Sequence, residues 1–142
     1  MSRIKDILQG RSLNWVEEDQ TVADVVKRMA ELNVGAILVV KGTELRGVFS
    51  ERDLMMRVVL PGVSPSSTPV GSVMSTEIAT LDETAGLEEA MERMQTHNCR
   101  HLPVMRNGQV TGFLSMRDLM NYELARKTEE LTHMRAYIHG TA

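Results

Sequence analysis

The sequence predicts an α+β fold in which one β-α-β-β-α unit occurs twice, the copies being related by a pseudo-twofold axis and packed sheet to sheet. Residues 47–55 read Gly-Val-Phe-Ser-Glu-Arg-Asp-Leu-Met, and 65 positions later residues 112–120 read Gly-Phe-Leu-Ser-Met-Arg-Asp-Leu-Met. The apolar faces of the preceding helices repeat as well. A single long stretch rich in Pro and Ser, residues 61–69, lies between the copies. We therefore predict units at 1–65 and 66–142, the second with a C-terminal helical extension.

Length and composition limit the possible classes of protein. A chain of 142 residues suits one compact domain and is short for two independent ones. The net charge of -3 gives no basic field for nucleic acid or an anionic membrane. The longest apolar runs, such as 36–40, have the length of a strand. The one cysteine, Cys99, allows no intrachain disulfide and suits a reducing compartment, so we expect a cytoplasmic protein that binds neither nucleic acid nor membrane.

The first unit is predicted from its apolar spacing and its helix-start and turn signals. Thr21, with Asp24 three residues later, predicts a capped helix that ends at Asn33. A continuous apolar run and a polar turn predict a hairpin, and a helix follows from Ser50 to about Leu60. The predicted elements are a short helix at 3–8, an extended piece at 14–16, a helix at 21–33, strands at 36–40 and 45–49, and the helix from residue 50.

The second unit repeats this order. Residues 70–74 echo 4–8, and Leu87, Ala90, Met91 and Met94 repeat the apolar helix face. Residues 101–105 and 110–114 predict strands joined by a turn at 106–109. The last helix begins at Ser115 and is expected to continue well past Tyr122. Its tail has no counterpart in the first unit, and its apolar residues suggest that it packs on something: Leu124, Leu131, Met134 and Ile138.

The repeated Ser-x-x-Asp opens a helix in both copies. On its own this pattern is a capping box, which very many helices have. Three features indicate that these helix starts could also bind a ligand. A helix N-terminus offers free N–H groups to phosphate, Arg52 and Arg117 add positive charge, and Asp53 and Asp118 could accept from the two hydroxyls of a ribose. These groups together suit a nucleoside phosphate.

The duplicated motif resembles the signature of cystathionine-β-synthase (CBS) domains, which occur in tandem as a Bateman module. The resemblance covers roughly residues 4 to 124. It extends to Arg100-His101-Leu102-Pro103-Val104 and Asn33-Val34-Gly35-Ala36, which are similar to the segments before the first hairpin strand in stand-alone CBS pairs. It implies a regulatory sensor, usually a homodimer and not an enzyme. Such a module has no catalytic cofactor and binds AMP, ADP, ATP, NAD(H) or S-adenosylmethionine in two clefts between the repeats.

The resemblance also implies roles for individual residues. The aspartates would hold ribose, Ser50 and Ser115 would lie near phosphate, and the residues before the Leu-Pro-Val strand would reach phosphate. Adenine would lie between apolar residues around 13–15 and 78–80. The predicted nucleotide-binding residues are therefore Leu13, Trp15, Gly35, Ala36, Ser50, Arg52, Asp53, Ile78, Arg100, His101, Pro103, Ser115, Arg117 and Asp118.

The two predicted sites differ in charge. Where the second copy has Arg100 and His101, the first has Gly35 and Ala36, so we expect unequal affinities. The sequence leaves open which cleft the Arg100–His101 pair serves. Trp15 could belong to the core or stack on adenine.

Other patterns suggest weaker alternatives. His97, Cys99 and His101 alternate, but alternate residues of one strand lie too far apart to converge easily on a metal ion, so we expect none. Nothing places a base beside either serine, so we do not expect a hydrolase. Several methionines lie on predicted helix faces. Core packing is the default interpretation for them, and an adaptable dimer surface is the second. They are Met55, Met56, Met91, Met94 and Met120.

Two functions remain. The first is an adenine-nucleotide sensor, homodimeric, that modulates an unknown effector protein. The second is a scaffold that uses the same fold only to dimerise or dock, with its clefts filled by side chains.

Overall fold

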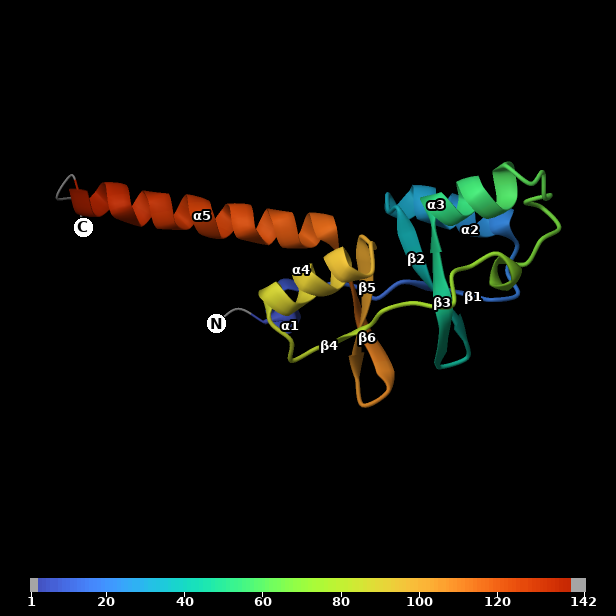
Figure 1. Cartoon of the computed structure of the whole chain (residues 1–142), viewed down its shortest axis with the longest axis horizontal. Coiled ribbons are helices and arrows are strands. Elements are labelled where there is room, and N and C mark those ends of the chain that lie inside the picture. The colour runs from blue at the N-terminus through green and yellow to red at the C-terminus, as the bar shows by residue number, and fades with distance from the viewer. Residues whose placement is uncertain (1–2, 139–142) are drawn as a thin grey trace.

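The computed structural model describes residues 3–138 and contains two three-stranded sheets, each covered by helices (Figure 1). The outer ends of the two predicted units lie outside the described residues. A short helix comes first, α1 (Ile4–Ile7). The first repeat follows as β1 (Trp15–Glu17), α2 (Val22–Leu32), β2 (Ala36–Lys41), β3 (Glu44–Ser50), α3 (Glu51–Asp53) and η1 (Leu54–Val59). The second comprises η2 (Val70–Ser72), β4 (Leu81–Asp82), α4 (Leu87–Thr96), β5 (His101–Arg106), β6 (Gln109–Ser115) and α5 (Met116–Ile138).

Both sheets have the same topology. The strand orders are β1-β2-β3 and β4-β5-β6, with the first pair parallel and the second antiparallel in each. Ala36 pairs with Ser50, and His101 pairs with Ser115, so both predicted hairpins are confirmed with equivalent registers. These pairings bring the start of the middle strand beside the start of the following helix in each repeat. Both predicted sites lie at such a junction.

Local signals end and begin the helices as predicted. The Thr21 hydroxyl accepts from the Asp24 amide N–H at 3.2 Å, which caps α2. Asn33 takes a left-handed conformation (φ 56°) that ends the helix, and Asn98 does the same after α4 (φ 49°). The second hairpin turns through Asn107 and Gly108, both with positive φ.

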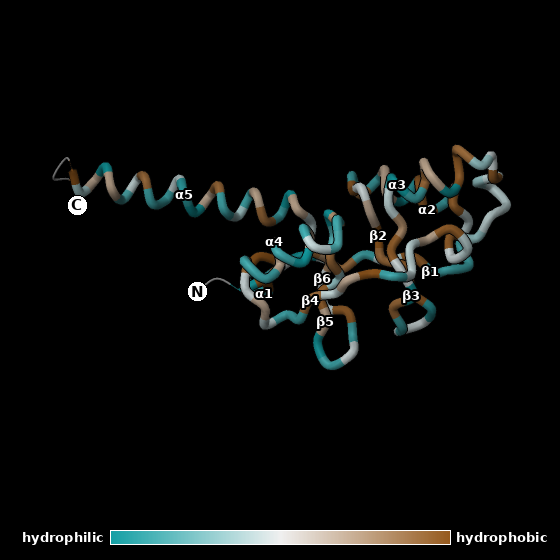
Figure 2. Tube along the Cα trace, viewed as in Figure 1, coloured by the Kyte–Doolittle hydropathy of each residue, from teal (hydrophilic) through white to brown (hydrophobic). Residues whose placement is uncertain are grey.

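Within residues 3–138, three clusters of apolar side chains hold the structure together. One lies inside each repeat, and the strands that contribute to it contain apolar segments, drawn in brown in Figure 2. A third, smaller cluster joins the two sheets and comprises Ala36, Leu38 and Val48 with Leu13, Leu45, Ile78, Val110 and Phe113. The predicted packing of sheet against sheet is therefore confirmed.

The segments that precede each repeat are exchanged between the cores. Ile4 of α1 is fully buried in the core of the second repeat, and its amide N–H donates to the carbonyl oxygen of Ala85 at 3.0 Å. Val70, Val73 and Met74 pack in the core of the first repeat. Because each core contains residues from the far side of the chain, neither repeat is complete without the other.

The helix after Ser50 differs from the prediction. After three α-helical residues it widens to a π-helix, in which the Leu60 N–H donates to the carbonyl oxygen of Met55. Val58 is fully buried, whereas Met55 and Met56 are about half exposed. The prediction that the helix methionines pack in the core is wrong for Met55, Met56, Met91 and Met120, and correct for Met94.

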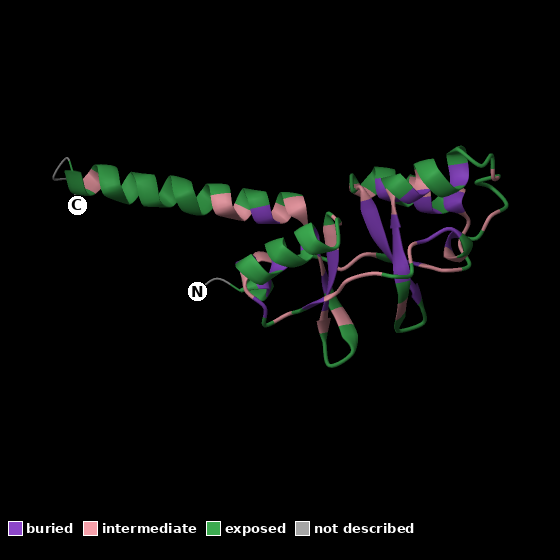
Figure 3. Ribbon diagram, in the orientation of Figure 1, coloured by how far each residue is buried: buried purple, intermediate pink, exposed green. Residues whose placement is uncertain are grey.

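Helix α5 extends far beyond the rest of the molecule. Only its first turns pack on the second repeat, where Leu119 is buried. Figure 3 shows the remainder as almost entirely exposed. The predicted continuation past Tyr122 is confirmed. No helix among residues 3–138 combines the length and the apolar character needed to cross a membrane.

Candidate functional site

Both repeated aspartates cap the helix that contains them. The Ser50 N–H donates to Asp53 Oδ2 at 3.0 Å, and the Asp53 N–H donates to Ser50 Oγ at 3.3 Å. In the second copy the Ser115 N–H donates to Asp118 Oδ2 at 2.8 Å, and the Asp118 N–H donates to Ser115 Oγ at 3.0 Å. The capping interpretation is confirmed twice, and one oxygen of each carboxylate is used in this way.

The second oxygen distinguishes the copies. Asp53 Oδ1 accepts from the Ser75 hydroxyl at 2.8 Å, and the Arg57 Nε lies 3.8 Å from it. The Asp53 side chain is only 8% exposed. We call Asp53 with Ser50, Ser75 and Arg57 the Asp53 site.

Asp118 Oδ1 instead accepts a hydrogen bond from Nη1 of Arg11, 107 residues earlier in the chain. The Asp118 side chain is 13% exposed, whereas that of Arg11 is 49% exposed, so about half of the arginine side chain faces solvent. We call Asp118 with Ser115, Arg11 and His101 the Asp118 site. Asp118 Oδ1 can therefore be freed by moving one long, half-exposed side chain, whereas Asp53 is itself buried and its Oδ1 also accepts from the Ser75 hydroxyl.

The positions of Arg11 and Glu77 are equivalent in the two repeats. Ile4 and Val70 are 66 positions apart, as are Arg11 and Glu77, and both pairs lie in the segments exchanged between the cores. The same position of the repeat is therefore positive in the first copy, as Arg11, and negative in the second copy, as Glu77. This reversal adds to the predicted asymmetry of Arg100 and His101 against Gly35 and Ala36.

His101 belongs to the Asp118 site and lies at the start of β5, where it pairs with Ser115. Its ring stacks on Phe113, with centroids 5.3 Å apart and planes 28° from parallel. Burial is the main cause that lowers the pKa of His101, and the positive charge of Arg100 lowers the pKa further. The negative charges of Asp118 and Glu51 act in the opposite direction and raise the pKa. The imidazole is therefore mainly neutral at pH 7. His101 therefore senses an acidic side chain from the helix start of each repeat.

The Asp118 carboxylate is charged throughout the physiological range. Burial alone would raise its pKa, but hydrogen bonds from Arg11 and Ser115, together with the positive charge of Arg11, hold the pKa below its ordinary value. The site thus combines a fixed negative charge, an adjacent cation that can move and a neutral imidazole. Such a combination can accept from hydroxyl groups and can also gain positive charge toward an anion.

The remaining predicted residues are spread around these sites. The carbonyl oxygen of Gly35 accepts from the Glu51 N–H at 3.0 Å, and that of Arg100 accepts from the Met116 N–H at 2.8 Å, so these backbones fix the helix starts. Arg52 and Arg117 are exposed, and Ala36 and Pro103 are buried in the strands. Ile78 packs against the cluster between the sheets.

Leu13 and Trp15 lie together in a small apolar pocket of about 230 Å³, away from both aspartates. Its other walls come from the hairpin ends, at Gly42, Thr43 and Gln109, opposite to the end of β6 that leads into α5. Trp15 is 51% exposed, so the alternative that placed it in the core is wrong.

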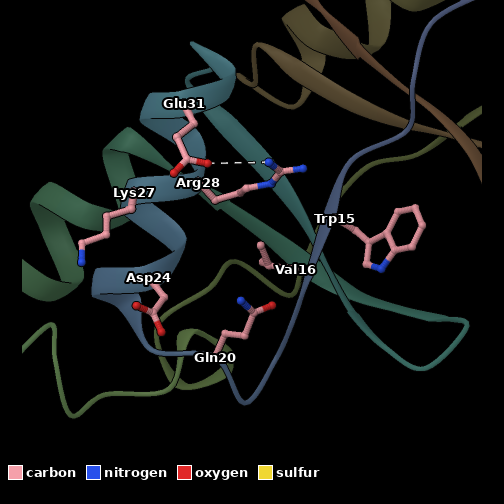
Figure 4. Close-up of a pocket in the computed structure, with 7 residues that line it drawn as sticks. All are labelled: Trp15, Val16, Gln20, Asp24, Lys27, Arg28 and Glu31. Atoms are coloured by element: carbon pink, nitrogen blue, oxygen red, sulfur yellow. Dashed lines mark ion pairs between the residues drawn. The ribbon is translucent and has the colours of Figure 1, made fainter.

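A second pocket, of about 400 Å³, lies between β1 and α2 (Figure 4). Asp24, Lys27, Arg28 and Glu31 reach it from α2, and Arg28 pairs with Glu31 at 3.7 Å. The charges balance, so this pocket has no field that favours an anion. Among the described residues, neither pocket is lined by Asp53 or Asp118.

Sequence reasoning missed three residues of the sites. Arg11, Arg57 and Ser75 contact the aspartates but lie outside the repeated motif. The reversal of charge between Arg11 and Glu77 was the one available signal. Within residues 3–138, no three His, Cys, Asp or Glu side chains gather as metal ligands.

Comparison with known families gives a match to the CBS domain over residues 4–60 and again over residues 70–125. The chain belongs to the CBS-domain family. Both repeats of the motif fall inside the matched ranges, so this is a tandem CBS pair, as the sequence resemblance implied.

Relatives and solved structures agree with this membership. The CBS domain-containing protein CBSX3, mitochondrial, of Arabidopsis thaliana is 36% identical over 131 residues, which are 89% of this chain and 64% of that protein. The chain thus spans less than two thirds of this relative's length. A solved protein with CBS domains from Burkholderia ambifaria MC40-6 is 33% identical, with a TM-score of 0.83 over 87% of this chain and 95% of that one. The CBS domain protein PAE2072 from Pyrobaculum aerophilum, solved in complex with AMP, is 27% identical, with a TM-score of 0.74 over 82% and 89%.

Proposed function

We propose that this CBS pair is a regulatory module that binds an adenosine-containing ligand at the Asp118 site. The observation that carries the proposal is the pairing of the Asp118 carboxylate with a half-exposed arginine that a ligand can displace. One carboxylate oxygen keeps the helix capped, while the other accepts from the ribose hydroxyls in place of Arg11. The AMP complex of the related PAE2072 supports this class of ligand.

The surrounding charges favour a phosphorylated ligand. Arg11, once displaced, is free to pair with phosphate, and Arg100 and His101 lie at the start of the adjacent strand. The amide groups at the start of α5 add their dipole. AMP, ADP, ATP or NAD therefore suits this site better than the cationic S-adenosylmethionine. The Asp53 site, buried and paired with Ser75, binds more weakly or not at all.

The proposed role is regulation of a partner protein, not catalysis. Displacement of Arg11 releases the segment that follows α1, and α1 is anchored in the second core by Ile4. Ligand binding would thereby change the surface near the N-terminus, which an effector can read. We propose that the module acts as a homodimer. The reducing cytoplasm remains the proposed location, although the Arabidopsis relative is named as mitochondrial.

A ligand-free scaffold is the second candidate function. It is favoured by the capping geometry, because in the structure each carboxylate already has partners for both oxygens. The two candidates differ in a direct experiment. Mass spectrometry of small molecules released from the purified protein, followed by equilibrium dialysis against AMP, ATP and NADH, should detect saturable binding if the module is a sensor. A melting temperature that no adenosyl ligand raises at saturation would instead establish the scaffold.

A further inference from the structure

Helix α5 carries an apolar face that the CBS pair itself does not cover. Leu119 is buried and turns toward the second core, whereas Met120, Leu124, Leu131, Met134 and Ile138 are each 55–71% exposed. Residues 123–138 would extend roughly 24 Å at the rise of an α-helix. Figure 1 shows this part projecting away from both sheets. An isolated helix of this length is marginal in water, so it needs a surface to pack on.

The exposed apolar residues form a heptad pattern. Together with Lys127 they occupy positions 120, 124, 127, 131, 134 and 138, with alternating spacings of four and three. At 100° per residue these six positions fall on one stripe, which lies roughly a quarter turn or more from the direction of Leu119. We call this stripe the α5 seam: Met120, Leu124, Lys127, Leu131, Met134 and Ile138.

We propose that the α5 seam pairs with the α5 seam of a second copy of this chain, antiparallel, with the twofold axis near Glu129. In this register every seam residue meets another seam residue. Met120 lies opposite Ile138 of the second copy, Leu124 lies opposite Met134, and Lys127 lies opposite Leu131. The apolar residues at the tip of one helix thus cover those near the body of the other. The proposal rests on the proposed homodimer and assigns its interface.

Charge decides the direction of pairing. In a parallel pair, Lys127 would face Lys127 of the second copy across the seam, which places two like charges in contact. In the antiparallel pair, Lys127 lies beside Glu130 of the second copy, and the same contact repeats on the other side of the axis. Neither Lys127 nor Glu130 has an ion pair within the described part of its own chain, so both are available.

A second exposed apolar surface is the competing interface. Met55 and Val59, on η1, lie 65 positions before Met120 and Leu124 and are 53% and 65% exposed. A dimer formed through these repeated positions alone would not need the distal residues Leu131, Met134 and Ile138, which have no counterpart in the first repeat. Substitutions in the distal residues therefore separate the two interfaces.

The test is the mass of the full chain in solution. Sedimentation equilibrium should give an assembly for the wild-type protein, and the double variant Leu131→Asp/Met134→Asp should have half that mass at the same concentration. The matched control Thr132→Asp/His133→Asp adds two acids to the other side of the same helix and should keep the wild-type mass. Circular dichroism confirms that all three remain folded.

Two results would overturn the proposal: a monomeric wild-type protein at tens of micromolar, or a seam variant whose mass is unchanged. In the second case, dissociation by Met55→Asp/Val59→Asp would assign the dimer to the competing interface. AMP binding, measured on the same samples, reports on the ligand site separately, and the seam variant should retain it.

The direction of pairing has its own test. In a Cys99→Ala background, Glu130→Cys should be cross-linked between two copies by a short bifunctional thiol reagent, because the two Glu130 positions lie near the axis. Leu124→Cys should not be, since the two Leu124 positions are far apart in the antiparallel pair. Cross-linking of Leu124→Cys, or of neither variant, would contradict the antiparallel register.

Discussion

Replacing Asp118 with Asn tests whether this carboxylate binds a ligand or only caps α5. The substitution keeps an oxygen that can accept from the Ser115 N–H, so the cap survives, but it removes the negative charge that pairs with Arg11. If the ribose hydroxyls donate to Oδ1, the loss of a charged acceptor weakens binding by roughly 1–2 kcal/mol. The ligand no longer has to break the Arg11 pair, which returns about 0.2–1 kcal/mol.

The central values of these two ranges leave a net loss of about 0.9 kcal/mol, so the Kd for AMP should rise by about 4-fold, and by at most about 20-fold, since each 1.4 kcal/mol is about a factor of ten. Stability should fall only by the value of one half-exposed ion pair, about 0.2–1 kcal/mol, or about 1–4 °C in melting temperature. Isothermal titration calorimetry and thermal denaturation measure the two quantities on the same sample.

Asp53→Asn is the matched control. Asp53 is buried, and its Oδ1 accepts from Ser75 close to the Arg57 guanidinium. Asp53→Asn should therefore lose more stability than Asp118→Asn, about 1–3 kcal/mol, but its loss of AMP affinity should be smaller. The reasoning is refuted if Asp118→Asn leaves the AMP affinity within twofold of wild type while melting as predicted, or if Asp53→Asn weakens AMP binding more than Asp118→Asn does.

Three further predictions concern other parts of the site and its support. Arg11→Ala should tighten adenosine binding by about 1.4- to 5-fold, because no ion pair has to break. It should not tighten AMP binding, because the cation that pairs with phosphate is lost. Calorimetry with both ligands measures this, and equal effects on the two ligands would contradict it. AMP affinity should rise as the pH falls from 8 toward 6. The unliganded site holds the pKa of His101 below its ordinary value of 6.5 and a nearby phosphate would raise that pKa, so that AMP binding takes up a proton. His101→Gln should flatten the pH profile, and proton release on binding would refute the idea. Gly47→Ala should destabilise the fold by about 1–3 kcal/mol in urea titrations, because a Cβ at Gly47 would lie 2.4 Å from a backbone carbonyl oxygen. Gly112→Ala should cost less, since its Cβ would meet, at 2.6 Å, the end of a leucine side chain that can turn aside. A larger loss for Gly112→Ala would be the contrary result.

Much of the fold could be predicted because its signals are local. The apolar run at 36–40, the turn residues Asn107 and Gly108 and the cap at Thr21 each fix their own segment, and the 65-residue repeat tells how the segments are grouped. The helix starts at Ser50 and Ser115 follow from the same kind of pattern. These features need no knowledge of the tertiary structure.

Other features depend on contacts between distant segments. The exchange of α1 and η2 between the cores is decided by packing, because Ile4 and Val70 would suit either core equally well by their side chains. The pairing of Arg11 with Asp118 spans 107 residues and involves no motif. Helical spacing likewise shows that Met120 and Met94 each lie on an apolar face, but only the tertiary structure shows that one is exposed and the other buried.

Nuclear magnetic resonance of the labelled full chain during an AMP titration tests the central claim most directly, because it reports where the ligand binds. We predict saturable shifts of the amide signals of Ser115 and Asp118, together with release of the Arg11 side chain, and smaller changes at Ser50 and Asp53. Saturation with AMP that leaves the Ser115 and Asp118 amides and the Arg11 guanidinium unchanged would contradict the account.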